Sequence, residues 1–185
     1  MAWADVGAHV VILETDRLLL RPYGPADLEG LVTLLGDPVV MRFWPEPFDR
    51  ERAVGWYRRA EEQLREHGYS RLATIERATG AYVGDCGLLR VGLDGRDEHD
   101  LGWILRADRH GRGYATEAAR ALLDHALGPL ALGRVVANMA TDHLASRRVA
   151  EKLGMRLEKR FRNPRNRMRE TCLYVGEAGE REGRR

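Results

Sequence analysis

Two glycines separated by one residue, Gly111 and Gly113, lie where a predicted strand gives way to a predicted helix. Glycine lets a backbone curl tightly and come close to a ligand. The first amide groups of a helix have no partner inside the helix, and together with the helix dipole they attract anions. With Arg106, Arg109 and Arg112 nearby, the pattern indicates a turn that can bind a pyrophosphate. The alternative is an ordinary strand-to-helix turn that needs glycine only for its geometry.

The same turn lacks the patterns of two common nucleotide-binding motifs. A nucleotide-hydrolase P-loop continues with Gly-Lys and then Ser or Thr, and no such sequence follows Gly113. A dinucleotide fingerprint has a different glycine spacing and follows a parallel βαβ unit, whereas the strands predicted before Gly111 are antiparallel. We therefore exclude both classes.

Cysteine chemistry and metal binding are not indicated by the sequence. The two cysteines, Cys86 and Cys172, lie far apart and lack the spacing of metal ligands, which argues against a disulfide scaffold and a cysteine-based zinc site. Cys86 falls in a predicted core strand, where packing is its expected role. We expect no metal site, and a reducing cytoplasm is the simplest compartment.

The composition is that of an ordinary globular protein. The 185 residues allow one domain, at about 100–200 residues per domain. We expect a single domain over residues 1–176 and a flexible, charged tail over 177–185. Thirty basic and 28 acidic residues give a net charge of +2, which argues against a dedicated nucleic-acid binder. No apolar run is long enough to span a membrane, and segment 1–11 lacks the basic start of a secretory signal.

The glycine turn needs a strand before it and a helix after it, and the sequence predicts a mixed α/β chain around them. Strands are expected over residues 17–22, 70–76, 82–91, 99–106, 132–139, 155–161 and 167–176. Helices are expected over 25–35, 50–67, 115–127 and 145–153, with turns at 79–80 and 92–96. The middle strands form an antiparallel meander, and one strand–helix–strand crossover lies near the centre.

Residues 111–118 resemble the acetyl-CoA-binding motif of the GNAT acetyltransferases, and the resemblance extends over 13–175. Segments 15–22, 83–88, 101–105 and 146–155 resemble the opening strand, two central strands and the late helix of one branch, which contains the ribosomal-protein N-terminal acetyltransferases. The order and spacing of these segments make the resemblance specific. It implies a mixed α/β GNAT fold, with a largely antiparallel sheet splayed at the acetyl-CoA cleft and flanking helices.

The resemblance also implies a coenzyme site on matching residues. The pantetheine arm would pair with the backbone of the strand before the glycine turn, and the pyrophosphate would take the amides of the turn. A polar residue on the next strand would meet the far end of the pantetheine. The residues at these positions are Ile104, Leu105, Arg106, His110, Gly111, Arg112, Gly113, Tyr114, Ala115, Thr116 and Asn138.

Three positions depart from the family pattern. His110 stands where the motif often begins with Gln or Arg, and His143 stands where an Asn is common. Ala150 occupies the position at which many members carry a tyrosine, proposed to protonate the leaving thiolate. Ser146 is the nearest polar candidate for that proton, with a local backbone hydrogen bond as its alternative role. Arg147 and Arg148 are candidates for the 3′-phosphate of the coenzyme.

Acetyl transfer to an amine also needs a base, because an alkyl amine is mostly protonated at neutral pH. Asp100, at the start of the strand before the glycine turn, matches a position where this branch often has Glu. It is the candidate base, and a solvated strand end is the alternative. Trp44 and Trp56 belong to a region that usually shapes the acceptor pocket in this fold, although core packing explains them equally well.

The function implied is direct acetyl transfer from acetyl-CoA to a primary amine, either a protein N-terminus or a small amine such as an aminoglycoside or polyamine. A non-catalytic acyl-CoA-binding module is the alternative, suggested by Ala150. A weaker reading is an RNA- or ribosome-associated protein that uses the arginines between Arg160 and Arg169. These arginines can equally be a solvated turn. No membrane or nucleic-acid partner is expected, and a homodimer is compatible with the resemblance.

Overall fold

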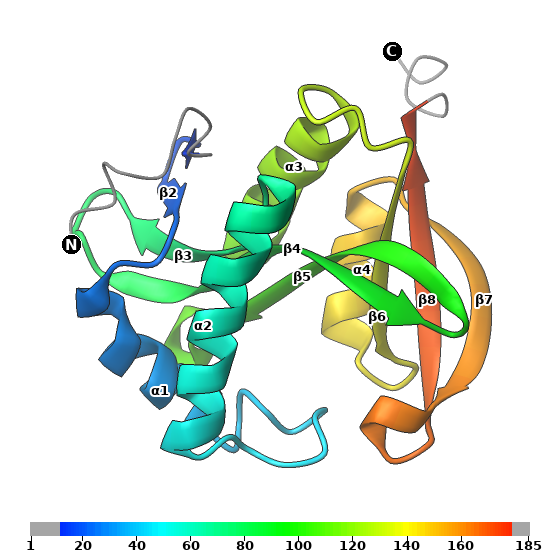
Figure 1. Ribbon diagram of the computed structural model, residues 1–185, viewed down its shortest axis with the longest axis horizontal. Coiled ribbons are helices and arrows are strands. Elements are labelled where there is room, and N and C mark those ends of the chain that lie inside the picture. Colours follow the sequence, from blue (N-terminus) through cyan, green and yellow to red (C-terminus); the bar gives the residue numbers. More distant parts are fainter. Residues whose placement is uncertain (1–11, 179–185) are drawn as a thin grey trace.

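The computed structural model describes residues 12–178, which form eight strands and four α-helices (Figure 1). The strands are β1 (Leu13–Glu14), β2 (Leu18–Arg21), β3 (Arg71–Glu76), β4 (Tyr82–Leu93), β5 (Arg96–Leu105), β6 (Arg134–Ala140), β7 (Arg156–Asn163) and β8 (Arg169–Glu177). The helices are α1 (Leu28–Gly36), α2 (Arg50–His67), α3 (Tyr114–Leu127) and α4 (Leu144–Lys152).

Local signals set the ends of the longest helix. The Asp49 side chain accepts a hydrogen bond from the Arg52 amide at 2.8 Å and so caps the start of α2. Gly68 ends the helix in the left-handed region, at φ +76°, which glycine adopts without strain. Both boundaries were predicted from these residues, and both are confirmed.

All eight strands form one sheet, in the order β1-β2-β3-β4-β5-β6-β8-β7. Every neighbouring pair is antiparallel except β5 and β6, which are parallel and joined by the crossover through α3. The predicted mixed α/β fold with a largely antiparallel sheet is confirmed. Within the described residues, no helix is both long and apolar enough to cross a membrane.

The parallel strands β5 and β6 separate soon after they meet. Their only register pair is Asp100 with Val136, near the middle of β5. Beyond this point β5 continues to Leu105 beside β4, while β6 continues beside β8. Figure 1 shows the two strands diverging toward the lower part of the view. The sheet is therefore splayed between β5 and β6, as expected for the cleft.

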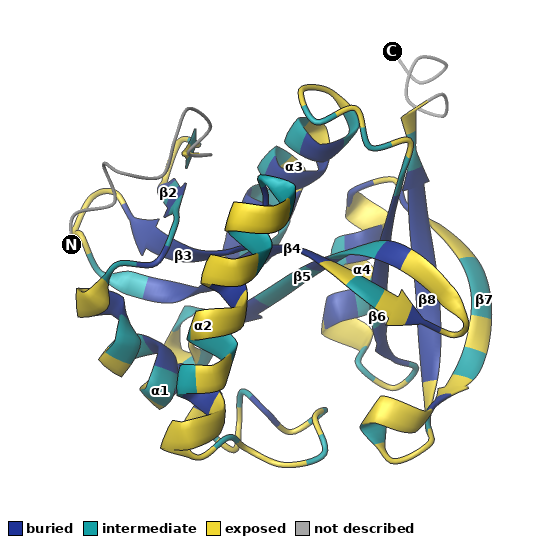
Figure 2. Ribbon diagram, viewed as in Figure 1, coloured by how far each residue is buried: buried dark blue, intermediate teal, exposed yellow. Residues whose placement is uncertain are grey.

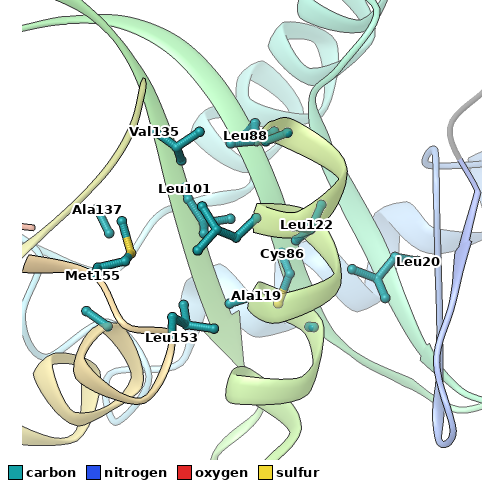
Figure 3. Close-up of a cluster of buried hydrophobic side chains, with 14 of the residues drawn as sticks. Leu20, Cys86, Leu88, Leu101, Ala119, Leu122, Val135, Ala137, Leu153 and Met155 are labelled. Carbon is teal, nitrogen blue, oxygen red and sulfur yellow. The ribbon is translucent and has the colours of Figure 1, made fainter. Parts of the chain in front are cut away.

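The sheet separates two hydrophobic cores. Helices α3 and α4 cover one face with the larger core, and α1 and α2 cover the other. The centres of β3, β6 and β8 are buried, whereas the edge strand β7 and the outer faces of the helices are largely exposed (Figure 2). In the larger core, Ala119 and Leu122 of α3 lie against Cys86, Leu88 and Leu101 of the central strands (Figure 3).

Replacing Leu122 with alanine should lower the free energy of unfolding by about 2–5 kcal/mol, because it removes buried methyl groups and leaves a cavity. Leu122 is only 2% exposed. Urea denaturation of this variant measures the loss. Leu144→Ala is the matched control in another helix, since Leu144 is 56% exposed, and its effect should stay within about 0.5 kcal/mol. Equal effects in the two variants would contradict the packing.

The structure differs from the sequence expectations at the β4–β5 hairpin. The strands reach Leu93 and Arg96, so the turn is two residues rather than the predicted 92–96. Asp94 and Gly95 both have positive φ, +49° and +80°. Asp-Gly favours this kind of tight turn, whose twist matches that of the paired strands. The sequence analysis also missed the two-residue strand β1.

At the C-terminal end, β8 includes Glu177, the first residue of the expected tail. The rest of that expectation concerns residues 178–185, and 179–185 lie outside the described residues. The expectation for segment 1–11 also lies outside them.

Candidate functional site

The glycine turn ends in an uncapped helix N-terminus. Gly111 and Gly113 have φ values of +74° and +83°, in the left-handed region that favours glycine. No side chain of residues 12–178 caps α3, and the Glu117 amide makes the helix's first backbone bond, to the Gly113 carbonyl at 3.1 Å. The amides of the first turn are therefore available to an anion. This geometry agrees with the predicted pyrophosphate site.

Arg17, just before β2, holds the turn in place from the outside. Its Nε donates to Glu117 Oε2 at 2.7 Å, and its Nη1 donates to the Arg112 carbonyl at 3.0 Å. Its guanidinium also lies over the Tyr114 ring, 4.6 Å from the centroid. The Tyr114 hydroxyl in turn donates to Glu76 of β3. The turn is thus connected to the residue before β2 and to β3 by these contacts.

The register of β5 decides which backbone groups face the cleft. The Arg106 amide donates to the Val83 carbonyl of β4 at 3.0 Å. Because alternate residues of a strand point to opposite neighbours, Ile104 also faces β4, whereas Trp103 and Leu105 face the opened side. The predicted backbone contacts of Ile104 and Arg106 with pantetheine therefore conflict with this register, and Leu105 remains.

His110 uses its ring within the chain. Its Nε2 lies 2.9 Å from the Leu105 carbonyl oxygen, so the ring stabilises the end of β5 just before the glycine turn. Among the other predicted coenzyme residues, Arg112 is exposed, Tyr114 is buried, and Ala115 and Thr116 are half-buried at the start of α3.

A cleft of about 300 Å³ lies between β5 and β6. Asp100 and Asn138 meet inside it, where the Asn138 amide donates to Asp100 Oδ1 at 2.9 Å. The lining also includes Trp44 and Trp56, predicted from sequence, and Trp103, which was not. Asp100 and Asn138 are thus brought together on neighbouring strands, and both line the cleft, while the contact of Asn138 with pantetheine stays a prediction.

Burial raises the pKa of Asp100 to about 6, although the hydrogen bond from Asn138 and the charge of Arg71 oppose the shift. A carboxylate with this pKa is ionised at neutral pH and yet accepts a proton more readily than an exposed aspartate. It therefore has the protonation behaviour expected of a general base near pH 7.

Ser146 and His143 line the cleft from the start of α4. Ser146 is buried, and its backbone amide donates to His143 Nδ1 at 3.4 Å. The imidazole stacks on Phe43, with ring centroids 3.8 Å apart. Burial and the nearby charge of Arg42 lower the pKa of His143 to about 4, so this ring is neutral at pH 7. Ala150 is fully buried in the core.

The remaining residues named from the sequence differ in their burial and contacts. Cys86 is fully buried, and burial raises the pKa of its thiol to about 11, in keeping with a packing role. Arg147 donates to the Tyr174 hydroxyl at 3.3 Å and to the Thr141 carbonyl at 3.1 Å. Of the arginines between 160 and 169, Arg165 lines the cleft.

Sequence reasoning missed Arg71, a buried charged residue that also lines the cleft. A signal for it was present: an arginine begins a strand whose six residues are all buried, and the next two strands carry glycines at Gly87 and Gly102. Without the register of the strands, these three positions could not be connected. Among the described residues, no group of three His, Cys, Asp or Glu side chains could hold a metal ion.

The chain matches known proteins over most of its length. The sequence model described as "Acetyltransferase (GNAT) domain" matches residues 17–156. Protein YkkB of Bacillus subtilis (strain 168) is 32% identical over 151 residues, which cover 81% of this chain and 88% of YkkB. The crystal structure of an acetyltransferase from Agrobacterium tumefaciens str. C58 has a TM-score of 0.78 at 28% identity, covering 91% of this chain and 95% of that one.

A more distant solved structure is RimL, a ribosomal L7/L12 alpha-N-protein acetyltransferase, in complex with coenzyme A. Its TM-score is 0.73 at 16% identity, covering 90% of this chain and 98% of that one. At this identity the likeness concerns the fold alone. GNAT enzymes use acetyl-CoA. On the match over 17–156 and the relationship to YkkB, the chain belongs to the GNAT acetyltransferase family and is an N-acetyltransferase.

Proposed function

We propose that this enzyme transfers the acetyl group of acetyl-CoA to an α-amino group bound in the cleft between β5 and β6, with Asp100 as the base. The observation that carries the proposal is the placement of Asp100: a carboxylate with a pKa of about 6 lies inside the cleft, on the strand that leads to the glycine turn. Strand β5 connects the two places: Asp100 lines the cleft, and the glycine turn follows the end of the strand without lining it.

The residues present fit acetyl-CoA as a substrate. The amides from Gly111 to Thr116 offer unpaired donors at the positive end of α3, which suits a pyrophosphate. The Leu105 amide faces the opened side of β5 and suits the pantetheine arm, which carries amide groups. Asn138 lies across the cleft from this strand. Together these groups follow the molecule from its phosphates toward its thioester.

The reaction balances with groups of this chain. The amine nitrogen attacks the thioester carbonyl carbon, so that a C–N bond forms and the C–S bond breaks. The proton lost by the amine passes to Asp100, directly or through a water molecule. The departing thiolate needs a proton, and Ser146 is the candidate donor because its hydroxyl group lines the cleft and Ala150 has none to give.

The pKa of Asp100 favours an α-amino acceptor. A free α-amino group has a pKa of about 7.7–8.0, whereas a lysine-type amine has one of about 10.4. Proton transfer to a carboxylate of pKa about 6 is therefore much less unfavourable from the α-amino group. A protein N-terminus meets this condition best, whereas the carboxylate of a free amino acid raises the pKa of its α-amino group above this range. Aminoglycosides and polyamines, which carry several positive charges, are the less favoured small amines.

The proposal predicts that the enzyme releases free thiol from acetyl-CoA when an α-amine is supplied, and that coenzyme A raises its melting temperature. The test is a thiol-release assay against N-terminal peptides, free amino acids, an aminoglycoside and a polyamine, together with thermal unfolding at increasing coenzyme concentration. Coenzyme at about 100 times its Kd should stabilise the fold by about 2.7 kcal/mol.

Thiol release with α-amines and little with the polycations would support the proposal. Efficient turnover of the aminoglycoside or polyamine alone would overturn the acceptor assignment while leaving the coenzyme site intact. Absence of coenzyme-dependent stabilisation would contradict the coenzyme site itself.

A further inference from the structure

The side chain of a buried arginine extends across two neighbouring strands and reaches the acceptor cleft. Arg71 begins β3, its side chain is only 5% exposed, and it lines the cleft together with Gly102 of β5. The register pairs Arg71 with Gly87 of β4, and Gly87 with Gly102. The three residues therefore form one row across three strands, and the side chain runs along this row toward β5.

The two glycines make the path of the side chain. A Cβ atom at Gly87 would lie 2.6 Å from the Arg71 Cα, and a Cβ atom at Gly102 would overlap Arg71 Nη1. Any other residue at either position would take space that the arginine and its strand occupy. Because both positions are glycine, the Arg71 side chain can lie across β4 and β5, and its guanidinium reaches the cleft.

One edge of the Arg71 guanidinium forms hydrogen bonds and an ion pair with Asp85. Its Nε and Nη2 bind the carboxylate of Asp85, and Nη2 also donates to the Asp85 carbonyl at 2.7 Å. Asp85 is completely buried and also accepts hydrogen bonds from the Tyr23 hydroxyl and from Trp56 Nε1, the latter at 2.8 Å. This network fixes the direction of the guanidinium, because every bond constrains the same carboxylate.

The other edge is open to the cleft. In the described part of the chain, no residue accepts a hydrogen bond from Arg71 Nη1, which lies against Gly102. Gly102 and Asp100 are on the same face of β5, two residues and roughly 7 Å apart. The base and the unpaired donor are thus neighbours, at a spacing that an amino group and a carboxylate of one small molecule can bridge.

The charged side chains that line the cleft also favour a ligand with a carboxylate. Besides Arg71, whose charge Asp85 neutralises, the lining of the cleft contains Arg59 and Arg165, whereas Asp100 is its sole carboxylate among the described residues. His143 is neutral at pH 7, since burial lowers its pKa to about 4. A cleft with this balance attracts an anionic ligand and disfavours a polycation.

We infer that Arg71 selects acceptors that carry a carboxylate: Nη1 binds that carboxylate while the α-amino group lies at Asp100. This inference rests on the proposed function and adds the substrate class, an amine with a negative charge close to the reacting nitrogen. Two sources share this chemistry, a free amino acid and an N-terminal peptide with an acidic side chain.

Matched substrate pairs separate the two sources. L-Phenylalanine and L-phenylalaninamide differ in the carboxylate of a free amino acid, and the aromatic ring suits the tryptophans of the cleft. Because this carboxylate also raises the pKa of the α-amino group, kcat/KM is compared per concentration of deprotonated amine. Two C-terminally amidated peptides, with aspartate or asparagine in the second position, differ only in an acidic side chain. In at least one pair, kcat/KM of the carboxylate member should be about tenfold to a hundredfold higher, as for one charged hydrogen bond.

Two variants test Arg71 itself. Gly102→Ala places a methyl group on Nη1 and should displace it from the cleft, while Asp85 still neutralises the guanidinium. The double variant Arg71→Gln with Asp85→Asn removes both charges, so neither partner is left buried and unpaired. Arg50→Gln is the control, because Arg50 forms an exposed ion pair with Glu29 and does not line the cleft.

In both test variants the preference for the carboxylate member should fall by about tenfold or more, mainly through a higher KM, while the neutral member keeps its KM. The control should keep the preference of the unmodified enzyme. Equal kcat/KM for the members of both pairs in the unmodified enzyme, with turnover present, would overturn the inference and leave the proposed function standing. No turnover of any amine and no stabilisation by coenzyme A would overturn both.

Discussion

Replacing Asp100 with asparagine is expected to lower kcat by about 10²–10⁴-fold and to leave the affinity for acetyl-CoA unchanged, because the variant loses the proton acceptor of the reaction. The Asn138 amide can still donate to the new side-chain oxygen, so the cleft keeps its shape. Steady-state kinetics with a reactive α-amine measure the first effect, and coenzyme-dependent thermal stabilisation measures the second.

The pH dependence identifies Asp100 more specifically than the loss of rate. In the unmodified enzyme, kcat/KM should decrease as the pH falls through about 6, where Asp100 takes up a proton. A second limb, from the amine itself, should lie near its own pKa of about 8. The asparagine variant should keep the limb of the amine and lose the limb near pH 6.

As the pH rises, the contribution of Asp100 to the free energy of unfolding should fall, whereas the activity should rise. Burial raises the pKa of Asp100 to about 6 in the folded state, against about 3.9 in an unfolded chain. Its contribution to stability is therefore fully present below about pH 4 and is lost as the pH rises through about 6. At pH 7.5 the asparagine variant should be at least as stable toward urea as the unmodified enzyme.

Asp97→Asn is the matched control for this experiment. Asp97 is on the same strand, is exposed, and forms an ion pair with Arg90 outside the cleft. Its replacement should leave kcat and the limb near pH 6 unchanged. An Asp100→Asn enzyme that keeps kcat within a few-fold of the unmodified enzyme would show that another group removes the proton.

Replacing Gly113 with glutamate is expected to remove the stabilisation of the fold by coenzyme A. Gly113 precedes the first turn of α3, so a carboxylate here would stand beside the amides proposed to bind the pyrophosphate and would repel it. Losing one charged hydrogen bond to a phosphate weakens binding by about tenfold to a hundredfold, and repulsion adds to this loss. Thermal unfolding with and without coenzyme measures the effect.

Backbone strain must be separated from charge in this variant, because Gly113 has a φ of +83°. Gly113→Ala imposes a similar strain without the charge and should weaken binding less. Gly80→Glu places the same side chain on another glycine of positive φ, +69°, in the turn between β3 and β4. That control should retain the full response to coenzyme. An undiminished response in Gly113→Glu would move the pyrophosphate away from this turn.

Much of the fold could be predicted because its signals are local. Asp49 and Gly68 mark the ends of α2, and the helix after Gly113 begins within one residue of the predicted position. Caps and turns depend on side-chain and backbone geometry within a few residues, so the sequence contains them directly. The β4–β5 turn is an exception, since residues 92–98 are mostly glycine and charged and give no strand pattern that shows how tightly Asp94 and Gly95 close the hairpin.

The candidate site was predictable in part for the same reason. The glycine turn and its helix are one continuous segment, whereas Asp100 and Asn138 were named because they match positions of the GNAT family. The prediction that the backbone groups of Ile104 and Arg106 face the coenzyme conflicts with the structure, because the direction of an amide depends on the register with β4. That register is a long-range property: the Arg106 amide pairs with Val83, 23 residues earlier.

The sequence by itself determined the family, the order of the elements and the turn that suits a pyrophosphate, because each rests on neighbouring residues. Only the tertiary structure decided how the cleft is charged. The pKa of Asp100 depends on burial between two splayed strands, and the reach of Arg71 depends on Gly87 and Gly102 standing in one row. Burial and cross-strand alignment arise from pairing between distant segments, which no local pattern encodes.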